Sequence, residues 1–157
     1  MTTPRSPVLQ ALYVGAEDRA REAAQGRDLG VHEAAALNDA ERLLVLLDED
    51  PQLVHAREVD DFTALHYAAF FGGPQAARVL VERGADVNAF ARNEQLEVTP
   101  LHSAAAARQV ETARILLEHG ADPNAEQQGG FTPLDSAVEN GDEEMQELLR
   151  AHGARVL

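Results

Sequence analysis

The feature that most constrains the fold of this chain is a short segment that recurs three times. It reads TALHYAA from Thr63, TPLHSAA from Thr99 and TPLDSAV from Thr132, so successive copies begin 36 and 33 residues apart. An apolar segment that ends in glycine follows each copy at a fixed distance. The period is therefore 33 residues, with one three-residue insertion between Asn88 and Thr99. Such repeats indicate stacked supersecondary units, because one unit cannot bury its apolar faces alone.

Turn chemistry within each unit predicts two helices joined by tight turns. The threonines suit the N-cap position, where a hydroxyl accepts a hydrogen bond from a free amide of the first turn. Pro100 and Pro133 then occupy the first helical position, where a missing N–H costs nothing. The second helices are expected at about 74–83, 110–119 and 142–152. Glycines that suit a left-handed helix exit are Gly72, Gly84, Gly120, Gly141 and Gly153.

The period and the T-P-L-H-x-A pattern resemble the ankyrin repeat family. The resemblance implies an all-α solenoid of stacked helix–turn–helix units with finger loops. We expect a single domain over 1–157 with a cap and four repeats. The expected ranges are 7–28 for an N-terminal helical cap, 29–57 for a degenerate first repeat, 58–89 for the second, 90–125 for the third with the insertion in its finger, and 126–157 for the fourth, a polar C-terminal cap.

The same resemblance assigns structural roles to residues of the motif. The family uses the motif histidine to tie the backbones of adjacent units together. Asp135 replaces that histidine in the last unit, and Arg108 replaces a usual glycine at a helix exit, so the turn geometry there is left open. The residues expected to serve the fold are Thr63, His66, Thr99, His102, Thr132, Gly84, Gly120 and Gly153.

The last unit has the composition of an end of the stack. Three apolar positions of the third unit's second helix become polar in the fourth, which is what a terminal cap requires. The changes run from Val110 to Glu143, from Ala113 to Gln146 and from Leu117 to Arg150. We therefore expect the array to end here.

Charge and composition exclude several classes of function. The formal net charge is −14 and no basic stripe offsets it, so we expect neither nucleic-acid nor membrane binding. A phosphate-binding loop needs a lysine, and the chain has none. His32-Glu33 begins like a zinc-binding helix, but Ala36 stands where the second histidine is needed. We expect no catalytic residue, no metal and no cofactor.

Composition also suggests where the chain works and where it comes from. A cysteine-free sequence without a signal peptide fits a cytoplasmic location. Arginine without lysine, and isoleucine only at Ile115, favour a GC-rich genome and hence a bacterial source.

Five of the seven aromatic residues lie at or near one set of motif positions. In the ankyrin family, the residue before the threonine and the end of the first helix face the concave groove. Two interpretations are open. The rings are partly buried against neighbouring fingers, or they form an apolar patch, rimmed by acids, that binds a protein. The candidate partner-binding residues are Phe62, Tyr67, Phe70, Phe71, Leu96, Val98 and Phe131.

The sequence therefore predicts a non-catalytic protein–protein interaction module that binds through its concave fingertip and first-helix surface. The expected partner carries apolar residues flanked by basic ones, and the chain itself is expected to be a monomer. Two alternatives stay open. A small-molecule-responsive regulator or enzyme would need a deep pocket. A self-associating scaffold would use the apolar patch to bind a second copy.

Overall fold

A computed structural model describes residues 6–26, 28–94 and 96–155 of the chain. Parts of several predicted ranges lie outside the described residues, namely 1–5, 27, 95 and 156–157. The described part contains ten α-helices, one short 3-10 helix and one two-stranded hairpin. The helices are α1 Pro7–Tyr13, α2 Glu17–Ala24, α3 Val31–Ala36, α4 Ala40–Glu49, η1 Pro51–His55, α5 Ala64–Phe70, α6 Pro74–Glu82, α7 Pro100–Ala106, α8 Val110–Glu118, α9 Pro133–Glu139 and α10 Glu143–Ala151.

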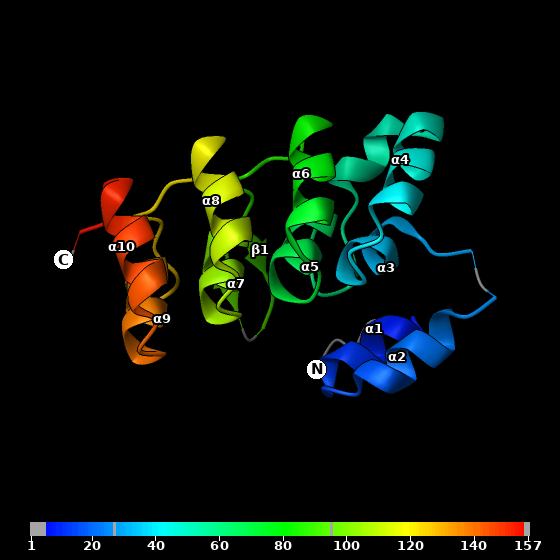
Figure 1. Cartoon of the computed structure of the whole chain (residues 1–157), viewed down its shortest axis with the longest axis horizontal. Helices are drawn as coiled ribbons and strands as arrows, with labels where there is room; N and C mark the ends of the chain where they lie inside the picture. The colour runs from blue at the N-terminus through cyan, green and yellow to red at the C-terminus, as the bar shows by residue number, and fades with distance from the viewer. Residues whose placement is uncertain (1–5, 27, 95, 156–157) are drawn as a thin grey trace.

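From α3 onward the helices pair and stack side by side into a solenoid (Figure 1). The first helices of the pairs, α3, α5, α7 and α9, form one row. The second helices, α4, α6, α8 and α10, form the other, and each helix packs on its neighbours within its row. This arrangement confirms the all-α repeat solenoid that the period predicted.

Small side chains allow the first helices to approach closely. Ala68 and Ala69 of α5 and Ala104 and Ala105 of α7 are fully buried. A motif leucine is buried beside them in each of the three units, at Leu65, Leu101 and Leu134. The row of first helices is therefore thin and closely packed, and its open face carries the longer side chains at the helix ends.

Each motif threonine caps the helix that follows it. The Thr63 hydroxyl accepts a hydrogen bond from the His66 N–H, and Thr99 acts in the same way on α7. Thr132 caps α9, and its own N–H donates to the Asp135 carboxylate at 2.8 Å. Asp135 thus closes the last capping box as histidine does in the two units before it.

The finger that contains the insertion is an ordered hairpin. Strand β1, Ala91–Arg92, pairs antiparallel with β2, Glu97–Val98. Between the strands, the Leu96 N–H donates to the Asn93 side chain at 3.1 Å, and the Asn93 N–H donates to the Leu96 carbonyl at 2.9 Å. The Asn93 amide group also donates to the Asp60 carbonyl at 2.8 Å, which ties this finger to the preceding one.

Four of the five glycines expected to be left-handed have positive φ. The values are 90° at Gly84, 94° at Gly120, 64° at Gly141 and 100° at Gly153. The prediction is wrong for Gly72, which has no positive φ and is needed for a different reason. A Cβ at Gly72 would lie 2.1 Å from the Ala35 carbonyl oxygen. Arg108 keeps the left-handed turn without glycine, at φ 60°.

The helices α1 and α2 form a hairpin that lies against the row of first helices instead of extending the stack (Figure 1). Ser6 caps α1, and its hydroxyl donates to the Glu33 carboxylate on α3. At the other end of α1, the Tyr13 ring lies 5.7 Å from that of Phe71, between centroids. These contacts reach the first repeat and the second, so the hairpin lies against α3 and the end of α5.

The final helix, α10, presents a polar side to solvent. Glu143 and Arg150 are exposed, and Gln146 is partly exposed. Met145 and Leu149 of the same helix are fully buried. The polar and apolar positions of α10 therefore separate onto two sides.

Candidate functional site

Exposed apolar side chains gather on the open face of the first-helix row. Phe70, at the end of α5, has 46% of its surface exposed, and Leu96, in the long finger, has the same fraction. Phe62 and Phe71 are partly exposed and pack against the core. All four line one cavity. The structure therefore brings together four candidate residues that reach solvent, three of them in or beside α5 and one in the long finger.

Two other candidate residues expose little or no surface. Tyr67 has no exposed surface and Val98 has 6%. The rings around Tyr67 and the pairing of β2 cover these two side chains, although both line the cavity. That they bind a partner stays a prediction. Phe131 is partly buried and stands apart, since the described lining of the cavity does not include it.

The rings of this surface hold one another in place. Phe70 meets Phe71 edge to face, with centroids 4.8 Å apart. Phe71 in turn stacks on Tyr67 at 6.3 Å, and Phe62 stacks on His66 at 5.5 Å. Edge-to-face and offset stacked rings attract one another beyond their buried area. The aromatic surface is therefore preformed.

A buried carboxylate anchors the aromatic cluster to the N-terminal hairpin. Asp60 is 3% exposed, and its Oδ2 accepts hydrogen bonds from the hydroxyls of Tyr67, at 2.7 Å, and Tyr13. Its Oδ1 accepts from the Phe62 N–H at 3.1 Å. Burial raises the pKa of both tyrosines, and the hydrogen bonds to Asp60 raise it further. Both phenols therefore stay protonated and continue to donate at neutral pH.

The motif histidines act as neutral ties between repeats. The His66 Nε2–H donates to the Val98 carbonyl at 3.0 Å, and the His102 Nε2–H donates to the Phe131 carbonyl at 3.2 Å. Each Nδ1 accepts a hydrogen bond from the amide of the preceding motif threonine. Burial lowers the pKa of His66 to about 4 and also lowers that of His102. Both rings line the cavity, but their nitrogen atoms are already used.

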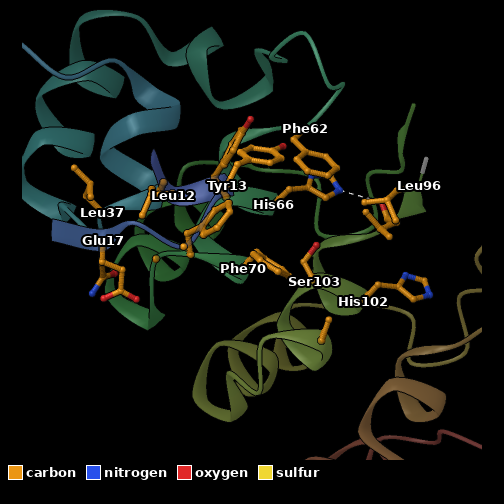
Figure 2. A pocket seen from close by; sticks show the side chains of 18 of the residues that line it. Leu12, Tyr13, Glu17, Leu37, Phe62, His66, Phe70, Leu96, His102 and Ser103 are labelled. Atoms are coloured by element: carbon orange, nitrogen blue, oxygen red, sulfur yellow. Dashed lines mark hydrogen bonds between the residues drawn. The ribbon is translucent and has the colours of Figure 1, made fainter. Parts of the chain in front are cut away.

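A cavity of about 810 Å³ lies between the aromatic cluster and the N-terminal hairpin. The hairpin of α1 and α2 forms one side, and the end of α3, α5, α7 and the long finger form the others (Figure 2). Figure 2 shows Tyr13 and Phe70 around one part of this space and Leu96 and Ser103 around another. Sequence reasoning missed the hairpin residues and Ser103. The hairpin lies outside the repeat period, and a serine in the motif carries no functional signal.

Other kinds of site find little support in the described part of the chain. It contains no group of three or more His, Asp or Glu side chains placed to hold a metal ion. His32 uses its Nε2–H to donate to the Ala56 carbonyl at 2.9 Å. No helix in the described ranges is both long and apolar enough to cross a membrane. The cavity and the rings around it are therefore the candidate site.

Two family matches cover the part of the chain that carries the aromatic cluster and the long finger. Residues 60–92 match the family described as "Ankyrin repeat", and residues 90–157 match the one described as "Ankyrin repeats (3 copies)". Together the matches span more than half of the chain. They include the helix pairs from α5–α6 to α9–α10.

Two plant proteins share part of the sequence. The serine/threonine-protein kinase VIK of Arabidopsis thaliana is 52% identical over 52 residues, which are 33% of this chain and 12% of that protein. The probable E3 ubiquitin-protein ligase XBOS31 of Oryza sativa subsp. japonica is 43% identical over 63 residues, 40% of this chain and 14% of that protein. The matches thus cover only a small part of either relative. They also give no support to the bacterial source expected from composition.

Proposed function

Because this chain belongs to the ankyrin repeat family, whose repeats indicate protein–protein interaction modules, we propose that it binds a partner protein through the open face of its first helices and finger loops. One observation carries the proposal. Phe70 and Leu96 each expose 46% of their surface on the same face, beside partly exposed Phe62 and Phe71. An exposed apolar cluster of this kind is typical of binding surfaces, where aromatic residues supply much of the affinity.

The charge around the cluster suggests the chemistry of the partner. The chain carries a net charge of −14. The exposed Glu17 lines the cavity beside the cluster, and the exposed Glu94 precedes Leu96 by two residues. Complementary charge speeds association and selects among partners. A partner with apolar side chains flanked by arginine or lysine would fit this surface.

We propose that the chain binds its partner without catalysing a reaction on it. His66 and His102, the side chains at the site best suited to proton transfer, spend both ring nitrogens on structural hydrogen bonds. Recognition would then be docking on a preformed surface, with little backbone movement. The cytoplasmic location expected from the sequence stays a prediction.

The proposal is tested by changing Phe70 to serine. The partner is first captured from the source organism with the purified chain and identified, and its affinity is then measured by calorimetry. We expect Phe70→Ser to weaken binding by about 2 kcal/mol, roughly 30-fold, because an aromatic anchor is lost. The free energy of unfolding should change little, since the ring is nearly half exposed.

Val45 supplies a matched control. It lies on α4, in the row of second helices, and also exposes 46% of its surface. Val45→Ser should bind the partner as the wild type does. Equal affinity of wild type and Phe70→Ser would refute the role of the aromatic cluster. A large loss of stability in Phe70→Ser would instead support the interpretation that the ring belongs to the core.

A further inference from the structure

The cavity exists because side-chain volume drops between two adjacent repeats. Tyr67 and Phe70 of α5 occupy the same motif positions as Ser103 and Ala106 of α7. A hydroxymethyl group and a methyl group thus replace two aromatic rings, and the space beside α5 is left unfilled. The N-terminal hairpin closes one side of this space through Tyr13. The resulting volume, about 810 Å³, lies within the range of small-molecule sites, roughly 300–1,000 Å³.

The Ser103 hydroxyl in this cavity has no partner among the described residues. Ser103 is 7% exposed and lines the cavity, and its hydroxyl makes no hydrogen bond with any described residue. Figure 2 shows this hydroxyl directed to the side of the cavity where His66 lies. The neighbouring polar groups differ, because the Tyr67 hydroxyl donates to Asp60 and His66 uses both nitrogens. No described side-chain polar atom is both buried and unpartnered, so the Ser103 hydroxyl is accessible from the cavity. A bound molecule can therefore donate a hydrogen bond to it or accept one from it.

The inner walls of the cavity carry no charge. His66 and His102 are neutral at physiological pH, and the Tyr67 phenol is protonated. Among the described lining residues, the charged side chains are Glu17 and Arg21, both at exposed positions of α2. A charged ligand would lose its hydration without gaining a counter-charge inside. An uncharged ring would instead pack against the aromatic walls.

We propose that this cavity binds one uncharged aromatic small molecule. Its ring packs among Tyr13, Phe70 and Phe71, and a hydroxyl, amide or carbonyl group on it hydrogen-bonds to the Ser103 hydroxyl. The site goes beyond the proposed function, because it is complete in the chain by itself and needs no partner protein.

The test uses 2-naphthol and naphthalene as probes with the whole chain. Calorimetry and NMR should show saturable binding of one probe molecule, with chemical-shift changes at the amides of Ser103 and Phe70. Ser103→Ala should weaken 2-naphthol several-fold and leave naphthalene unchanged, because only 2-naphthol can hydrogen-bond to the serine. Ser136 occupies the same motif position in the last repeat and lies outside the described lining, so Ser136→Ala should have no effect.

A second pair of variants fills the space directly. Ala106→Phe introduces the ring that the preceding repeat carries at the equivalent position, Phe70. Ala106 is exposed, so the fold can accommodate the larger side chain. We expect at least about a 10-fold loss of affinity for both probes. Glu139→Phe makes the same change one repeat later, outside the described lining, and should bind the probes as the wild type does.

Three results would overturn the inference. They are the absence of saturable binding to the wild type, equal binding by folded Ala106→Phe, and an equal effect of Ser103→Ala on both probes. Circular dichroism checks that each variant folds. If Ala106→Phe does not fold, the comparison of the two probes with Ser103→Ala tests the inference. A chain that binds its protein partner through Phe70 but takes up neither probe would overturn this inference and leave the proposed function intact.

Discussion

At the scale of single residues, His66 could transfer protons, but in this fold its ring hydrogen-bonds one repeat to the next. Its Nε2–H donates to the Val98 carbonyl in the next repeat, and its Nδ1 accepts from the Thr63 N–H. A proton on Nδ1 would place a charge in a buried site and remove that acceptor. Burial therefore lowers the pKa of His66 to about 4.

The lowered pKa makes stability depend on pH in a defined direction. In the unfolded chain the histidine titrates near 6.5, and in the folded chain near 4, so the unfolded state binds the extra proton between these values. The contribution of neutral His66 to the free energy of unfolding is fully present above about pH 6.5 and is lost as the pH falls toward 4. We expect the free energy of unfolding to drop by up to about 3 kcal/mol across this window. Urea denaturation at a series of pH values measures it.

His66→Asn serves as the control for this prediction. Its side-chain oxygen keeps an acceptor for the Thr63 N–H but does not titrate. The variant should be less stable than wild type at neutral pH and should show a shallower decline on acidification. An unchanged pH profile would assign the dependence to another group, with His102 the first to examine because its pKa is also lowered.

At the scale of elements, the second helices hold adjacent repeats together through buried leucines. Leu80 of α6 and Leu116 of α8 are fully buried, and α8 packs against both α6 and α10. Most of the stability of a repeat array comes from such interfaces between neighbours. The loss of one leucine should therefore weaken two interfaces at once.

Leu116→Ala tests this interface. We expect it to lower the free energy of unfolding by about 2–5 kcal/mol, the range for deleting a buried leucine side chain. Chemical denaturation measures the change. Leu44→Ala on α4, where the leucine is 38% exposed, should cost clearly less. A loss below about 1 kcal/mol for Leu116→Ala would mean that the α8 interfaces contribute little.

At the scale of the whole molecule, the solenoid presents an open apolar face within a strongly acidic surface. Copies that each carry a net charge of −14 repel one another, and this repulsion opposes self-association through that face. Salt screens such repulsion over distances beyond about 8 Å at physiological ionic strength. Oligomeric state is therefore best measured at both low and physiological salt.

We expect a monomer at both salt concentrations. Light scattering across a range of protein concentrations should give a mass close to 17.0 kDa. The scaffold alternative predicts a mass that rises toward twice this value with concentration and returns to the monomer value in Phe70→Ser. That second result would make the aromatic cluster an interface between copies of this chain.

The sequence by itself determined the features that depend on neighbours within one repeat. Thr63, Thr99 and Thr132 cap their helices through groups three residues ahead, so the same local chemistry recurs wherever the motif does. The all-α solenoid follows from this recurrence, because each unit must bury its apolar faces against the next. The aromatic cluster could also be anticipated, since its positions are set by the motif.

Tertiary structure alone decided which of those aromatic residues are reachable and where the cavity lies. Tyr67 and Phe70 are three residues apart, yet one is fully buried and the other half exposed, because adjacent elements cover only the first. The cavity also needs Tyr13, which reaches Asp60 from a hairpin outside the repeat. No local rule connects residues so far apart along the chain. Only the packing of the hairpin against α3 and the end of α5 brings them together.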